Sequence, residues 1–141
     1  MRRRLSKMNS NALRAYDQVS RVTLSGPEIE AAVLTKAAMK LKDCQDNWHA
    51  DERDSKLDKA LKFNQRMWSI FQGELGREDN PLQKDVRRDV LKLSAFVDKR
   101  ILEIMAYPEP EKLTAIISIN QNIAAGLRQR PVTNVYSNLQ L

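Results

Sequence analysis

The chain has 141 residues, of which 42% are hydrophobic and 30% are charged, and its formal net charge is +6. This length is typical of one domain with a modest core, and the composition is that of a globular protein. No apolar run approaches the roughly 20 residues that a membrane-spanning helix needs, which argues against insertion into a membrane.

The positive charge is concentrated at the two ends of the chain. Residues 1–7 carry four basic residues and residues 128–141 carry two, whereas positions 8–127 hold all 18 acidic residues and 18 basic ones. A nucleic-acid-binding domain usually has its basic patch on the fold itself, so the folded body is not expected to bind nucleic acid. Residues 1–8 are expected to form a disordered basic arm, with an upstream-start artefact before Met8 as the alternative. No apolar segment follows the first basic residues, so we expect no secretory signal.

Residue types that carry catalysis are scarce. Cysteine and histidine each occur once, as Cys44 and His49. One of each cannot form a disulfide within the chain or supply the ligands of a usual zinc site. We expect Cys44 to be a small buried residue and His49 to be solvated or to cap a helix. The four glycines are scattered singly, which excludes a glycine-rich phosphate loop. We therefore expect no metal, no cofactor and no enzymatic activity.

Glycine and proline fall at a few breakpoints, and the long stretches between them lack both, as helices require. The first predicted helix spans residues 9–22. The second spans residues 27–48 and starts at SGPE, in which Ser25 and Glu28 form a capping-box pattern. The apolar stripe of the second helix consists of Ile29, Val33, Ala37, Leu41, Cys44 and Trp48.

The third predicted helix spans residues 52–75 and follows an acidic entry, HADERD, that suits a helix N-terminus. An amide interrupts its apolar stripe at Asn64. A second stripe lies beside the first and contains Phe63, Met67 and Ile70. The main stripe consists of Leu57, Leu61, Asn64, Trp68, Phe71 and Leu75.

The fourth predicted helix spans residues 82–107, with Asn80 as a plausible N-cap and Pro81 in the first turn. Asp98 stands in an otherwise apolar line, where it either pairs with a cation at the edge of the face or marks a polar contact. The core stripe consists of Val86, Val90, Leu93, Val97, Ile101 and Ile104, and Leu91, Leu102 and Met105 are expected to widen it.

The fifth predicted helix spans residues 111–126, with Gly126 as its C-terminal stop. Its stripe consists of Leu113, Ile116, Asn120, Ile123 and Leu127. Residues 128–141 show no helical stripe and are expected to form a flexible tail. Short connections make neighbouring helices antiparallel. The sequence therefore predicts an all-α, antiparallel bundle of about five helices over residues 9–127.

Two asparagines, Asn64 and Asn120, interrupt stripes that are otherwise apolar. A buried amide costs roughly 1–3 kcal/mol unless it is hydrogen-bonded. The two amides can satisfy each other and fix the register of the helices. Alternatively, one or both border a groove that receives a helix of another chain.

Several segments resemble the FlaF family of bacterial flagellar proteins. The resemblance covers residues 9 to about 127, whereas the basic arm and the tail after Gly126 match no family pattern. The segments are NALRAY and SGPEIEAAVLTKAA, then ALKFNQRMWSIFQGEL followed by NPL, then DVRRDVLKLSAFVDKRILEIM, and finally PEPEKLTAIISINQNIAAGL.

The resemblance implies a non-catalytic cytoplasmic factor that acts on flagellin beside the regulator FlbT. The terminal segments of flagellin are amphipathic helices, and an apolar groove in a bundle can cover such a helix. We therefore predict a flagellin-binding chaperone or adaptor that promotes flagellin export and flagellum assembly. The alternative is a post-transcriptional regulator that contacts flagellin mRNA, directly or with FlbT, for which the basic ends are the sequence support.

The third and fifth helices carry more apolar surface than one core face needs. Methionine and aromatic side chains suit an adaptable binding surface, although a helix at the centre of a bundle is also buried nearly all round. The predicted flagellin-binding residues are Phe63, Asn64, Met67, Trp68, Phe71, Ile116, Asn120 and Ile123.

Overall fold

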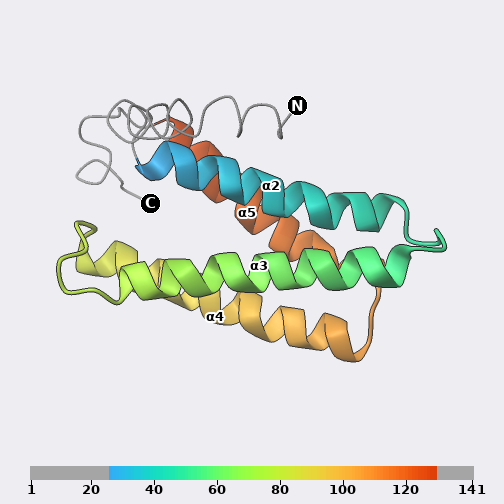
Figure 1. The fold of residues 1–141 in the computed structure, drawn as a ribbon. Coiled ribbons are helices and arrows are strands. Elements are labelled where there is room, and N and C mark those ends of the chain that lie inside the picture. The colour runs from blue at the N-terminus through green and yellow to red at the C-terminus, as the bar shows by residue number, and fades with distance from the viewer. Residues whose placement is uncertain (1–25, 130–141) are drawn as a thin grey trace, which may run out of the picture.

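The computed structural model describes residues 26–129, and this part of the chain is built from helices joined by short connections (Figure 1). The predicted all-α class is confirmed for these residues, which contain four α-helices, one short 3-10 helix and no strand. The predicted helix at residues 9–22, the basic arm and the tail beyond residue 129 lie outside the described residues. The α-helices span Gly26–Asp46 (α2), Arg53–Leu75 (α3), Lys84–Ala106 (α4) and Thr114–Arg128 (α5), and the 3-10 helix η1 spans Pro110–Leu113.

Helix α2 packs against both α3 and α5, and its contact with α5 is the most extensive in this part of the chain. Helix α4 packs mainly on α3 and touches α5 and η1 only lightly. The colours of Figure 1 show α3 returning along α2, and α5 returning to the end of the bundle where α2 begins. One side of α4 therefore has no neighbour among the described helices. Within residues 26–129, no helix combines the length and apolar character that crossing a membrane requires.

The start of α4 differs from the prediction because Asn80 shapes the preceding loop instead of capping the helix. Its side-chain oxygen accepts a hydrogen bond from the backbone N–H of Leu82 at 3.0 Å, and its amide donates to the carbonyl of Glu74 at 3.0 Å. These two bonds close the α3–α4 connection. The helix then begins at Lys84, two residues later than predicted.

The limits of α5 also differ from the prediction. Residues Pro110–Leu113 form the tighter η1, so the α-helix starts at Thr114. Gly126 does not stop the helix, and no described glycine has the positive φ that a glycine stop uses. The helix continues to Arg128, whose guanidinium donates to the carbonyl of Ala31 on α2 at 3.3 Å. This bond, together with the burial of Leu127, favours the additional residues of helix.

Most of the predicted stripe residues are buried or partly buried in one core. Two predictions were wrong: Ile29 is 42% exposed and Leu93 is 36% exposed. On α2 the buried face is centred on Leu34 and Leu41, and Ile29 lies to one side of it. Small residues bring packed helices closer together, which suits the extensive α2–α5 contact. The fully buried alanines of α2 are Ala31, Ala37 and Ala38.

The prediction that Cys44 is buried is confirmed. Cys44 is 3% exposed, and burial raises the pKa of its thiol. His49 is exposed in the turn between α2 and α3. The exposed acidic residues on the outward faces of α2, α3 and α4 include Asp43, Asp46, Asp58, Asp85 and Asp89.

Adjacent residues on α4 provide a test of where the core ends. Ile101 is fully buried and Leu102 is 60% exposed. We expect Ile101→Ala to lower the free energy of unfolding by about 2–5 kcal/mol, because it leaves a cavity. Leu102→Ala should change it by no more than about 0.5 kcal/mol. Urea denaturation followed by circular dichroism measures both, and equal losses would show that Leu102 is covered.

Candidate functional site

The two asparagines hydrogen-bond to each other at the centre of the bundle. Both are fully buried, and the Asn120 amide donates to the side-chain oxygen of Asn64 at 2.7 Å. The Asn64 amide donates to the carbonyls of Ala37 at 3.2 Å and Ala60 at 2.9 Å. The Trp68 indole N–H donates to the oxygen of Asn120 at 3.0 Å. The amides thus satisfy each other and tie α2, α3 and α5 into one register, as in the first of the two alternatives.

This network fixes the position of Trp68, which borders a pocket at the end of the bundle where α2 begins. Phe71 lies one turn further along α3 and meets the Trp68 ring edge to face, with 5.7 Å between the ring centroids. The pocket has a volume of about 370 Å³. Its apolar lining comes from all four α-helices and the α3–α4 connection, through Leu34, Trp68, Phe71, Leu75, Pro81, Leu82, Val90, Ile123 and Leu127.

Acidic residues border the same pocket. Glu30 on α2 is largely buried, and this desolvation, with a smaller contribution from Glu74, raises the pKa of Glu30 from 4.5 to about 7. In contrast, Arg77 is neutralised locally, since its guanidinium donates two hydrogen bonds of 3.0 Å to Asp79 and lowers the pKa of that carboxyl. Within the described part of the chain, neither the Glu30 nor the Glu74 side chain has a hydrogen-bond or ion-pair partner.

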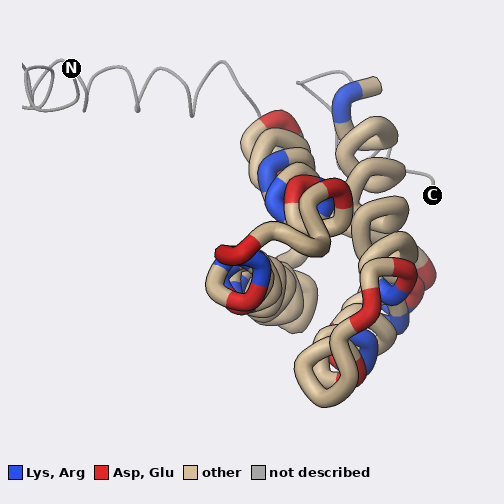
Figure 2. Tube along the Cα trace, turned by 90° about the vertical axis from the view of Figure 1, so that its right-hand side faces the viewer, with Lys and Arg blue, Asp and Glu red and all other residues tan. Residues whose placement is uncertain are grey.

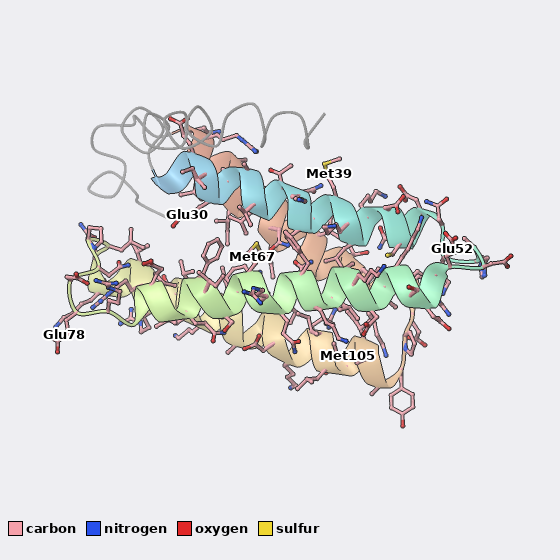
Figure 3. All side chains as sticks on the ribbon, viewed as in Figure 1. Glu30, Met39, Glu52, Met67, Glu78 and Met105 are labelled. Carbon is pink, nitrogen blue, oxygen red and sulfur yellow. The ribbon has the colours of Figure 1, made fainter. Side chains whose placement is uncertain are left out.

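Three of the eight predicted binding residues, Trp68, Phe71 and Ile123, are brought together at the pocket. The other five lie elsewhere in the bundle. Asn64, Asn120 and Ile116 are fully buried, and Met67 is 4% exposed and points from α3 towards α2 (Figure 3). Phe63 is partly buried beneath the ammonium groups of Lys36 and Lys40, which lie 5.7 and 5.2 Å from its ring centroid. Contact of any of the eight with a partner stays a prediction.

The sequence did not predict the acidic rim of the pocket, which consists of Glu30, Glu74 and Asp79. One signal was present: Glu30 falls four residues before Leu34 and eleven before Leu41, in line with the buried face of α2. The remaining lining residues could not be assembled from periodicity, because they come from separate elements. Figure 3 shows Glu30 and Glu78 at the pocket end of the bundle and Glu52 at the opposite end.

A second apolar surface lies on α4. We call it the α4 outer face, and it consists of Leu91, Leu102 and Met105, which are 37%, 60% and 40% exposed. The expectation that these residues widen the buried face was wrong, because no other described helix covers that side of α4. Asp98 lies instead at the contact with α3 and marks a polar contact, since it accepts a hydrogen bond from the Gln72 amide at 2.9 Å, and the same amide also donates to the Ser94 hydroxyl.

Residues 26–129 contain no group of three or more His, Cys, Asp or Glu side chains that could hold a metal ion. The fold and the site define a small all-helical protein with an apolar, acid-rimmed pocket at one end of its bundle. The chain belongs to the FlaF family, because the family model described as flagellar protein FlaF matches residues 12–127. Comparison with curated proteins and with solved structures gave no match. Family membership makes this a flagellum-related protein.

The buried amide network predicts non-additive mutational effects. Asn64→Ala and Asn120→Ala each leave a buried polar partner unsatisfied, so each should lower the free energy of unfolding by about 1–3 kcal/mol. The loss of unfolding free energy in the double variant should be smaller than the sum of the two single losses, and the difference should be about 0.5–3 kcal/mol. Denaturant titration of the wild type, the two single variants and the double variant measures this difference as a double-mutant cycle. Asn122→Ala, on the exposed side of α5, is the matched control and should change stability little. Additive losses would contradict the coupling.

The raised pKa of Glu30 predicts how stability depends on pH. Its carboxyl is protonated more readily in the folded protein than in the unfolded chain, so ionising it costs folding free energy as pH rises from 4.5 to about 7. Glu30→Gln should therefore be more stable than the wild type above pH 7, by on the order of 2 kcal/mol, and equally stable near pH 4. Glu52→Gln, at the far end of the bundle, should show no such pH-dependent difference. Thermal melts across pH 4–8 measure both variants.

Proposed function

We propose that this FlaF-family chain is a non-catalytic, cytoplasmic chaperone or adaptor that binds a terminal helix of flagellin and promotes its export and flagellum assembly. The observation that carries the proposal is the apolar pocket, bordered by Trp68, Phe71 and Ile123, in a member of a flagellar family. Phe71 and Ile123 are only partly buried, so both retain surface that a partner can cover.

The size of the pocket limits how a helix can use it. About 370 Å³ is near the lower end of the volumes of ligand pockets and accommodates side chains, not a whole helix. We therefore propose that the client helix lies across the pocket and inserts apolar residues from one face, spaced as i, i+3 or i+4. The client must be released for export, which favours moderate affinity over a permanent interface.

The charge distribution supports a protein partner over mRNA. Residues 26–129 hold 17 basic and 17 acidic residues, so this part of the fold is formally neutral. Figure 2 shows the two signs interspersed along α2, α3 and α4, with Arg128 as the charged residue of α5. RNA binding depends on clustered cations that neutralise phosphates. FlbT remains a candidate second partner in this proposal.

Phe71 provides the sharpest test of the proposed function. Phe71→Ala should weaken binding of purified flagellin about tenfold or more, since buried aromatic anchors dominate helix-binding interfaces. The matched control is the neighbouring Ile70→Ala. Ile70 is 57% exposed and does not line the pocket, so its removal should leave affinity within about twofold.

Size-exclusion chromatography and calorimetry measure the complex, and thermal melts of both variants separate loss of binding from loss of fold. Separate elution of wild-type protein and flagellin at tens of micromolar (about −6 kcal/mol) would contradict the proposal. Equal weakening by the two substitutions would place the interface outside the pocket.

A further inference from the structure

We propose that the pocket selects a partner helix in which a lysine or arginine lies one turn from the apolar residue that enters it, with the cation held between Glu30 and Glu74. This inference rests on the proposed function and adds the chemistry of the segment that is bound. It assigns an anchoring role to two carboxylates that the internal packing of the bundle does not use.

The two carboxylates line one apolar cavity and come from different helices. Glu30 comes from the first turns of α2 and Glu74 from the last turn of α3, and both line the pocket together with Phe71 and Ile123. Figure 3 shows Glu30 on the side of α2 that faces α3. An apolar side chain in the cavity would thus bring the neighbouring turn of its helix within reach of both acids.

Among the described residues, the charged side chains that line the pocket are Glu30, Glu74, Asp79 and Arg77, so the rim carries a net negative charge even though Arg77 also attracts Glu74. Arg77, the one basic residue that lines the pocket among those described, already forms two hydrogen bonds with Asp79. Two carboxylates of like charge in one cavity raise each other's energy, and a cation between them removes that repulsion. An anionic or purely apolar partner would leave the repulsion in place, so the rim discriminates against such segments.

Protonation of Glu30 links this recognition to pH. Burial, followed by the nearby Glu74, brings the pKa of Glu30 to about 7, and a bound cation would lower it. Binding should therefore release protons near neutral pH, and affinity should rise from pH 6 to pH 8. Glu74 on α3 is the charged group that acts on Glu30. Arg77 and Asp79 in the α3–α4 connection line the same pocket, and Arg128 on α5 bonds the carbonyl of Ala31, the residue after Glu30.

The test measures the affinity of full-length flagellin at pH 6 and pH 8 for the wild type and for the double variant Glu30→Gln, Glu74→Gln. Glu52→Gln is the control, because Glu52 is an exposed acid at the opposite end of α3. We expect the double variant to bind about tenfold more weakly at pH 8 and to lose the pH dependence, while the control behaves as the wild type. Calorimetry in buffers of different ionisation enthalpy should show proton release with the wild type and with the control, but not with the double variant.

The outcomes separate the inference from the proposed function. If wild-type protein does not bind flagellin, the proposed function fails and the inference fails with it. If flagellin binds and the double variant binds equally well, the inference alone is overturned. Thermal melts show whether the double variant is folded, which separates loss of binding from loss of structure. Glu30→Gln should keep or raise stability at pH 8.

A third full-length variant tests whether the cation comes from the chain itself. It replaces the four basic residues of positions 1–7 with glutamine. Unchanged flagellin affinity and unchanged pH dependence support a cation supplied by the partner. Tighter binding together with loss of the pH dependence would show that the chain's own basic arm neutralises the rim, and would overturn the inference.

Discussion

The hydrogen bond between Asn64 and Asn120 is the constraint on which the pocket depends. Each side chain is fully buried, so a shift of α5 along α3 would leave two amides unpaired in an apolar interior. Because the Asn120 amide group donates to Asn64, its side-chain oxygen remains available to accept the hydrogen bond from the indole N–H of Trp68. Trp68 in turn holds Phe71 edge to face at the pocket. One polar contact therefore sets helix register and the position of the aromatic wall together.

The acidic rim works against the stability that this network provides. Glu30 is largely withdrawn from water and lies near a second carboxylate, and both effects disfavour its ionised form at neutral pH. An apolar or amide side chain at this position would avoid the cost. Groups held in such unfavourable surroundings are concentrated at functional sites, where a ligand relieves the strain. Within residues 26–129, this conflict between packing and charge occurs at the pocket end of the bundle, which favours that end as the site.

Periodicity predicted the helices well because each is long and its apolar residues repeat at helical spacing. It also found Asn64 and Asn120, since each is an amide in an otherwise apolar line. The pocket could not be found in this way, because it is formed where four helices and a loop converge. The α4 outer face shows the same limit. Its broad apolar stripe predicted burial, yet Leu102 is 60% exposed. Burial depends on which helices are neighbours, and periodicity within one helix does not contain that information.

Apolar contact and charge have separate roles in the binding mode that the pocket supports. Burial of an anchor against Phe71 and Ile123 would supply most of the affinity, because apolar burial is favourable for any side chain that fits. Paired charges contribute less to affinity than to the choice and orientation of the partner. Glu30 adds a further property, since the ionised form that attracts a cation is only partly populated near pH 7. Local acidification would weaken the charged contact while the apolar contact persisted, so a client could be loosened without opening the core.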